Sequence, residues 1–247
     1  MKTKPTNWDT GKNNSNHGYV TTLFCTLPDG TTATYGMTDL MSFTGSWSLY
    51  ADTYDIGNTV MNQVEFTIDI ARKEGIAPQT LAIDNYFPKM TKVEVSTQLM
   101  VGTTSYGVCP MGVYYTDKPN YDYESGIVTI TAYDPMFLAN VTPFAEGSFV
   151  SVWQHPTLRQ VATHLVTGTD ISGVIESNFN GISSFRGDTA LVLEDVTQVP
   201  DDIYMDSIPY GYTVREILGE IAIAACGNWT IVTGQAPSLR LASKLPS

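Results

Sequence analysis

The sequence has few charged residues and little cysteine. Asp, Glu, Lys and Arg make up 15% of its 247 residues, against about 25% in a typical globular domain. The three cysteines, Cys25, Cys109 and Cys226, lie far apart and form no CxxC pair. This sparse, odd set argues against a disulfide scaffold and against a zinc site, and favours buried free thiols.

Long apolar runs are also missing. No run approaches the roughly 20 residues that a membrane-spanning helix needs. Residues 1–5 (MKTKP) lack the hydrophobic region of a signal peptide. We therefore expect a protein made in the cytoplasm, with no membrane insertion by this region.

Basic residues are scarce: 13 stand against 25 acidic ones, which gives a net charge of −12. The densest basic run, residues 2–12, contains three lysines in a polar segment. Tight binding of nucleic acid needs clustered Lys and Arg to neutralise phosphates. The composition therefore argues against nucleic-acid binding and favours a solvated acidic surface.

The familiar catalytic motifs GxSxG, GxGxxG, HExxH and the phosphate-binding loop are all absent. His155 and His164 are nine positions apart, too far for a metal pair on one helix, and His17 lies in a polar segment near the amino terminus. Asp201, Asp202 and Asp206 lack the glycine and glutamate of an EF-hand, so a solvated turn is the simpler interpretation. We predict no catalytic, cofactor-binding or metal-binding residues.

Asparagine and the aromatic residues give two weaker signals. Asn13, Asn140 and Asn228 each begin an N-x-Ser/Thr triplet, which means little without a secretory route. The 14 tyrosines and 4 tryptophans suit packing in a core or interface, or else a carbohydrate-binding platform.

Strand patterns dominate the first half. In 127–133 β-branched residues alternate at period two, and Asp134-Pro135 ends the run because proline donates no ladder hydrogen bond. Pro28-Asp29-Gly30 marks a hairpin turn. The predicted strands are 19–27, 31–35, 41–50, 60–71, 92–101, 107–116 and 127–133, with a polar loop or short helix at 72–81.

After Asp134 the apolar period becomes helical. One helix is predicted at 156–167, ended by Gly168. A second is predicted at 213–226, where Thr213 and Glu216 form a capping box and Gly227 caps the end. A possible strand at 190–193 and a closing hairpin of 228–232 and 238–242 complete the pattern.

These patterns predict a mainly β protein with an α+β part: an antiparallel β-barrel or sandwich, followed by a smaller α+β domain. The expected limits are a flexible tail at 1–18 unless a neighbour holds it, a β-barrel domain at 19–138, and an α+β domain at 139–247.

Several short phrases resemble those of tail-tip and baseplate-hub proteins of tailed bacteriophages and prophages. Residues 112–119 (GVYYTDKP) match a G-x-Y-x-x-D-K-P strand and turn, and 130–136 (ITAYDPM) match I-T-A-Y-D-x-M. Residues 213–222, 226–231 and 238–241 are similar to that family's helix and closing hairpin. The similarity spans roughly residues 20–243.

The resemblance implies a non-catalytic virion structural protein of the tail tip, a hub region with a tube-like β-barrel and a second α+β domain. It implies a homotrimeric ring that joins the tail tube to distal components, with a distal tail protein, the tail tube and a tape-measure protein as partners. DNA would be a partner only in passage through the lumen. Longer members carry a peptidase or fibre region, so this chain is expected to be a short member or a fragment, and no lytic residues carry over.

Two other classes stay open. One is a carbohydrate-binding module for cell-surface glycans, which would use exposed aromatic rings. The other is an enzyme that uses a pair of carboxylates, whose separation the sequence does not give.

Overall fold

The computed structural model describes residues 4–46, 56–57, 59–142, 156–168, 181–182, 184–185, 188–189, 192–205, 211–232 and 237–243. The chain forms two compact units. We call the first, which comprises Met1–Trp47, Asn62–Asp134 and Thr233–Gln235, the sheet unit. The second, the helical unit, comprises Ser48–Met61, Pro135–Val232 and Ala236–Ser247. The domain limits expected from the sequence stay a prediction.

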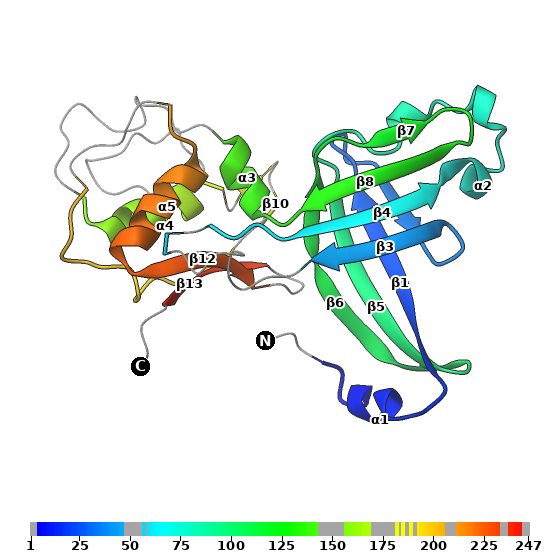
Figure 1. Ribbon diagram of the computed structural model, residues 1–247, viewed down its shortest axis with the longest axis horizontal. Helices are drawn as coiled ribbons and strands as arrows, with labels where there is room; N and C mark the ends of the chain where they lie inside the picture. The colour runs from blue at the N-terminus through cyan, green and yellow to red at the C-terminus, as the bar shows by residue number, and fades with distance from the viewer. Residues whose placement is uncertain are drawn as a thin grey trace. The chain divides into compact units, whose positions relative to one another are not determined.

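The sheet unit is built on one eight-stranded antiparallel sheet (Figure 1). Its strand order is β2-β1-β5-β6-β8-β4-β3, and β7 pairs with β8. The strands are β1 (His17–Thr26), β2 (Thr32–Tyr35), β3 (Leu40–Ser46), β4 (Gln63–Asp69), β5 (Lys92–Val101), β6 (Thr104–Thr116), β7 (Asn120–Asp122) and β8 (Ile127–Tyr133). The predicted fold class, mainly β with a smaller α+β part, is confirmed.

Of the two predicted forms, barrel or sandwich, the barrel is wrong, because the sheet of the described residues is not closed. The described strands form an open path that ends in β2 and β3, and these two strands do not pair with each other. The physical reason is that, among the described residues, β2 pairs only with β1, and β3 only with β4. Closure of a barrel needs the first and last strands to exchange ladder hydrogen bonds.

Alternation along the strands produces the core of the sheet unit. Val64, Phe66 and Ile68 on β4 are fully buried, and they face the buried residues of β8 across the ladder. Phe87 packs against the Phe66 ring with centroids 5.9 Å apart, and against Tyr35 at 5.1 Å. Such tilted and edge-to-face ring contacts stabilise the core beyond the burial of apolar area.

Short helices cover parts of the sheet. α1 (Trp8–Lys12) lies within the segment predicted to be flexible unless a neighbour holds it. Its Gly11 is buried so closely that an added Cβ would lie 2.6 Å from Tyr106 Cγ. Helix α2 (Ile70–Glu74) follows β4 directly, and the 3-10 turns η1 (Pro78–Thr80) and η2 (Ile83–Asn85) come next.

Asp134 ends β8 with more than the expected effect of the following proline. Its side chain is fully buried, and its Oδ2 accepts hydrogen bonds from Asn62 N at 2.9 Å and from Asn62 Nδ2 at 3.0 Å. Asp134 N donates in turn to Asn62 O at 2.9 Å. The end of β8 is therefore fixed to the start of the β4 segment, within the sheet unit.

The helical unit contains α3 (Met136–Val141), α4 (Leu158–Thr167) and α5 (Val214–Ala224). Figure 1 shows α4 and α5 on one side of a small sheet of order β11-β13-β12. Its strands are β11 (Val192–Asp195), β12 (Gly227–Val232) and β13 (Ser238–Ser243), and a separate pair is formed by β9 (Ser184–Phe185) and β10 (Asp188–Thr189). The closing hairpin is confirmed, since β12 and β13 pair in antiparallel fashion; β11 joins β13 in parallel.

Both predicted helices are present, and both begin with a capping box. Gly168 ends α4 at φ +68°, as predicted. The predicted cap of α5 by Gly227 is wrong, because Gly227 is the first residue of β12 and Cys226 takes the positive φ of +50°. Helix α3, which starts directly after Pro135, was not predicted.

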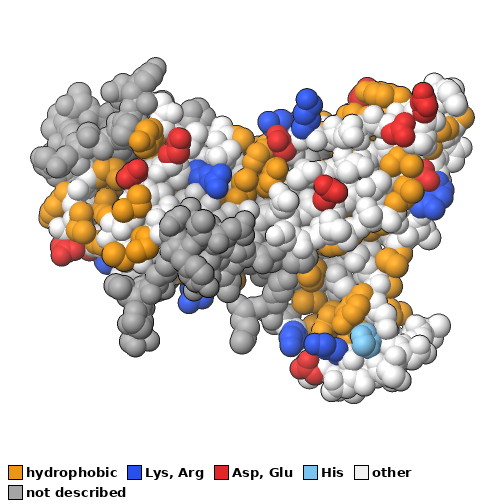
Figure 2. Space-filling view, in the orientation of Figure 1, with side chains coloured by type: hydrophobic (Ala, Val, Ile, Leu, Met, Phe, Trp, Pro, Cys, Tyr) orange, Lys and Arg blue, Asp and Glu red, His pale blue; other side chains and the backbone are white. Residues whose placement is uncertain are grey.

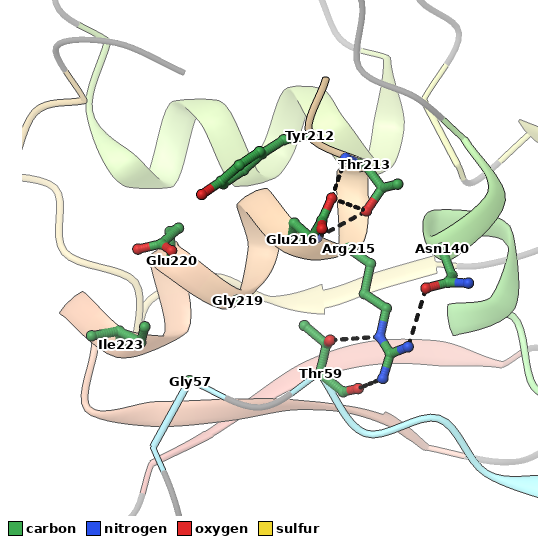
Figure 3. A pocket seen from close by; sticks show the side chains of 10 residues that line it. All are labelled: Gly57, Thr59, Asn140, Tyr212, Thr213, Arg215, Glu216, Gly219, Glu220 and Ile223. Carbon is green, nitrogen blue, oxygen red and sulfur yellow. Dashed lines mark hydrogen bonds between the residues drawn. The ribbon is translucent and has the colours of Figure 1, made fainter. Parts of the chain in front are cut away.

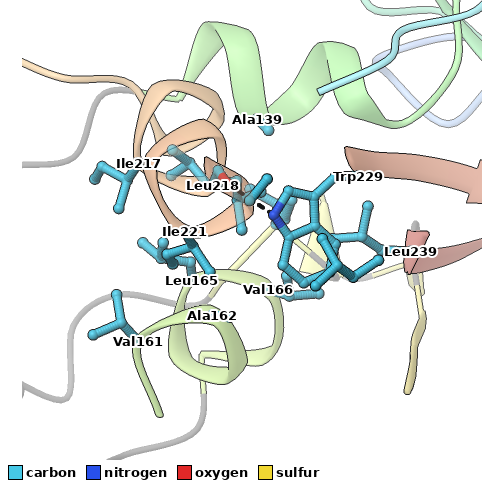
Figure 4. Close-up of a cluster of buried hydrophobic side chains, with 14 of the residues drawn as sticks. Ala139, Val161, Ala162, Leu165, Val166, Ile217, Leu218, Ile221, Trp229 and Leu239 are labelled. Carbon is cyan, nitrogen blue, oxygen red and sulfur yellow. Dashed lines mark hydrogen bonds between the residues drawn. The ribbon is translucent and has the colours of Figure 1, made fainter. Parts of the chain in front are cut away.

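Trp229 lies at the centre of the helical core (Figure 4). Its side chain is fully buried, and its Nε1 donates a hydrogen bond of 2.8 Å to Leu218 O on α5. This bond satisfies the one polar group of the indole ring and fixes α5 on β12.

Candidate functional site

A hollow of 480 Å³ lies beside α5 in the helical unit. Figure 3 shows its lining side chains, which come from α5 and the two residues before it, from the end of α3 and from the segment before β4. The lining is Gly57, Thr59, Asn140, Tyr212, Thr213, Arg215, Glu216, Gly219, Glu220 and Ile223. Small molecules bind most often in pockets of about this size.

The start of α5 forms one wall of the hollow. Thr213 N and Oγ1 both donate to Glu216 Oε2, at 2.7 and 2.9 Å, and Glu216 N donates back to Thr213 Oγ1 at 3.3 Å. These hydrogen bonds lower the pKa of the Glu216 carboxyl from its ordinary value. The Glu216 carboxylate thus serves the backbone of its own helix.

Arg215 reaches the opposite wall. Its Nε donates to Thr59 Oγ1 at 2.8 Å and its Nη2 to Thr59 O at 3.0 Å. Nη1 donates to Asn140 Oδ1 at 3.2 Å. The rigid fork of the guanidinium suits such a multiple contact. Arg215 therefore holds α5, α3 and the segment around Thr59 together within the helical unit.

Two glycines let the chain pass close to α5. Gly57 has φ +92°, and an added Cβ there would overlap the Ile223 side chain. A Cβ on Gly219 would lie 3.2 Å from Gly57 O. Gly57 N also donates to Gly227 O at 3.0 Å, and Val60 N to Trp229 O at 2.9 Å. Gly57 and Val60 are thereby both hydrogen-bonded to β12.

The polar groups of the hollow mostly hold the fold. Arg215 is engaged by Thr59 and Asn140, and Glu216 by Thr213. Glu220 is exposed one turn further along α5. Within the described part of the chain, no three His, Cys, Asp or Glu side chains gather as a metal site.

The residues singled out in the sequence do not converge. His164 is buried on α4, whereas His17 is exposed, with Nδ1 2.7 Å from Asn14 O. Asp201 Oδ1 accepts from Thr157 Oγ1 at 3.0 Å, and Asp202 is exposed. His155 and Asp206 lie outside the described residues.

The cysteines and the asparagine triplets are also dispersed. Cys25 is fully buried, and burial raises the pKa of its thiol to about 12. Cys109 is buried and Cys226 half-buried, and all three are free thiols. Asn13 is exposed, Asn140 contacts Arg215, and Asn228 is fully buried.

Sequence reasoning missed Arg215 and Asn62. Arg215 stands inside the phrase 213–222 beside the capping box, and it is one of only 13 basic residues. That scarcity was the one available signal. Its partner Thr59 is 156 residues away in sequence, so no local pattern could reveal the contact.

No helix in the described parts of the chain combines the length and apolarity needed to span a membrane.

No protein-family model matches the chain, and no curated protein matches it. Among solved structures, it is similar to the 43 kDa tail protein of prophage MuSo2 from Shewanella oneidensis, at 15% identity and a TM-score of 0.40. The match covers 93% of this chain and 57% of the other, so the chain spans somewhat more than half the length of that protein. The similar structure is a phage tail protein, and the match does not single out the tail tip or the hub. Similarity at this level does not establish a shared fold or function.

Proposed function

We propose that the chain is a non-catalytic structural subunit of a phage-like tail, placed in the tail tip or baseplate hub. In this role it joins the tail tube to distal tail components. The proposal starts from the phrases at 112–119, 130–136, 213–222, 226–231 and 238–241, which resemble tail-tip and hub proteins.

The observation that carries the proposal is the structural role of these sequence stretches in the fold. The phrase 130–136 ends β8 and supplies Asp134, which fixes that strand to Asn62. The phrase 213–222 forms α5 and supplies Arg215. The phrase 226–231 supplies Trp229, whose indole holds α5 to β12. The stretches that resemble the family therefore include residues that hold each unit together, which agrees with a structural role.

The surface agrees with a role in assembly. Figure 2 shows scattered charges on a largely neutral face of the molecule. Neutral polar surface can be buried against a neighbour at a lower desolvation cost than charged surface. As a partner set we propose further copies of the chain as a homotrimer, a distal tail protein, the tail tube and the tape-measure protein, with the virion tail tip as its location.

The test uses particles produced by a phage or prophage that encodes this chain. Gold-labelled antibody against the chain is expected to bind at the end of the tail distal to the head. Deletion of its gene is expected to give particles with incomplete tails, and expression of the chain in trans restores them. Unlabelled particles, or normal infectious particles from the deletion, would contradict the proposal.

A carbohydrate-binding module is the second candidate, and a cluster of rings beside α1 favours it. The Trp8 and Tyr19 rings have centroids 6.2 Å apart, and the His17 and Tyr19 rings 5.5 Å apart. Tyr19 is 44% exposed. Saccharide binding on a glycan array that is lost in Tyr19→Ala, and kept in the exposed Tyr123→Ala, would support this function. No binding to any glycan by the intact chain would count against it.

A further inference from the structure

Two strand edges of the sheet unit are open among the described residues. At one end of the strand path, β2 covers β1 only from Leu23 to Thr26, so 17–22 of β1 pair with β5 alone. At the other end, β3 pairs with β4 alone. Strand edges like these present unpaired backbone N–H and C=O groups to any extended segment.

Neither edge carries the usual protection against pairing. Natural edge strands are blunted by charged residues, proline or bulges. The stretches 17–22 (HGYVTT) and 42–46 (SFTGS) contain no Asp, Glu, Lys, Arg or proline. A register shift in β3 falls between Leu40 and Ser42, so the pairing of 42–46 with β4 is regular. β3 is also mostly exposed, with Met41 at 56%.

The directions of the two edge strands suit pairing between copies. The path from β1 to β3 runs through six strands, and each neighbouring pair is antiparallel. β1 and β3 therefore run in opposite directions. If a second copy is rotated about an axis along the strands, its β3 meets β1 in the antiparallel sense. Such head-to-tail contacts generate rings when the rotation closes.

The faces of the two strands fix the register. On β1, Val20 and Thr22 lie on the face opposite to the buried Leu23, and on β3 Thr44 lies opposite to the inward Phe43. A slip by one residue would turn every side chain to the other face. We take the antiparallel register in which inward residues pair with inward ones and outward with outward ones, and in which the pairing ends at Thr22, before the part of β1 that β2 covers. This register sets Val20 opposite Thr44. It also sets the half-exposed Tyr19 opposite Gly45.

We infer that copies of this chain join head to tail through β3 of one copy and residues 18–22 of β1 in the next. The inference deepens the proposed structural role, because it names the surface through which the copies meet. The number of copies in a closed ring does not follow from it. A tyrosine ring over an edge glycine is a recognised way to stabilise such a strand pair.

Size predicts that the contact is weak in isolation. Five residue pairs form it, whereas stable interfaces use about 20–30 residues on each side. The pair therefore has to be trapped covalently rather than observed as a stable oligomer in dilute solution.

The experiment mixes two variants of the full chain that each carry one added cysteine, Thr44→Cys and Val20→Cys, at high concentration under oxidising conditions. A disulfide needs Cβ atoms about 3.5–4.5 Å apart, and one residue pair can miss this distance locally. The mixture of Ser42→Cys with Thr22→Cys, the next pair on the same face, is therefore tested in parallel. The expected product is a mixed dimer that exceeds both homodimers severalfold in at least one of the two mixtures. Thr31→Cys, at an exposed turn position, is the matched control partner for Thr44→Cys, and the parent protein controls for Cys226.

Each outcome decides the inference. Mixed dimers support it, together with their loss when Phe43→Lys is added to the Thr44→Cys or Ser42→Cys copy. Because Phe43 packs against the core, the loss counts only if the circular dichroism of that copy matches the parent. Homodimers alone, or an equal yield with Thr31→Cys, overturn it, as does the absence of any mixed product from variants whose circular dichroism matches the parent. If mixed disulfide dimers form but the chain is missing from tail particles, the strand contact is supported and the proposed function is contradicted. Labelled tail tips without trapped pairs would do the reverse.

Discussion

Replacement of Arg215 by methionine tests whether the hollow beside α5 is a structural joint. Methionine keeps much of the apolar stem and removes the three hydrogen bonds to Thr59 and Asn140. Buried hydrogen bonds from a charged donor contribute about 1.5–3 kcal/mol each, and neutral ones about 1 kcal/mol. Arg215 is only half-buried, and water replaces part of the loss. We expect a total cost of about 2 kcal/mol in the free energy of unfolding of the helical unit.

The matched control is Arg159→Met, because Arg159 also makes three guanidinium hydrogen bonds in the same unit. Its acceptors are Val199 O, Asp201 Oδ2 and Thr197 O, and it does not contact Thr59 or Asn140. In hydrogen exchange, Arg215→Met is expected to speed the amides of Gly57 and Val60 by about thirtyfold, which corresponds to about 2 kcal/mol. Arg159→Met should leave those amides unchanged. The same exchange pattern in both variants, or a cost below about 0.5 kcal/mol for Arg215→Met, would refute the reasoning.

Three further predictions follow from the described contacts. Gly57→Ala should destabilise the helical unit by more than about 1 kcal/mol in urea titration, because of the φ of +92° at Gly57 and the overlap of the new Cβ with Ile223. The double variant with Ile223→Ala should recover part of the lost stability. No recovery would exclude the overlap as a cause. Glu216→Gln should reduce the loss of stability on acidification. The pKa of Glu216 is lowered in the folded protein, so its contribution to stability is full above the unfolded value of about 4.5 and is lost as pH falls through the folded pKa. Unfolding free energies at pH 7 and pH 3 measure this, with Glu220→Gln as control, and an equal change with pH in the two variants would contradict it. Cys25 should escape alkylation at pH 8 in the folded protein and react after unfolding in urea, because it is fully buried and its thiol pKa is raised to about 12. Mass spectrometry of peptides measures the modification, with the half-buried Cys226 as the comparison. Rapid modification of native Cys25 would contradict this and show that the sheet opens readily.

The parts of the fold that sequence predicts well are those encoded locally. The predicted strand 92–101 matches β5, and the alternation in 64–70 reports the buried face of β4. The capping box of Thr213 and Glu216 is present as expected. Each of these signals lies within a few neighbouring residues, where side-chain spacing and cap chemistry determine the backbone.

The parts that sequence did not predict depend on distant residues or on too short a pattern. Helix α3 has six residues, and most of them are buried, so it shows no helical alternation of polar and apolar positions. The open sheet follows from which strands meet, which no single strand encodes. The Arg215 contact joins residues that only the folded chain brings together.

The two units also share one chain in an interleaved way. Segment 48–61 belongs to the helical unit although it lies between β3 and β4 of the sheet unit. Val60 then donates its backbone hydrogen bond to Trp229, near the other end of the chain. A ribosome therefore releases an early piece of the helical unit long before the α5 and β12 residues that receive it. A gene divided at codon 134 would encode two products, and the second would lack the piece that Arg215 and Trp229 bind.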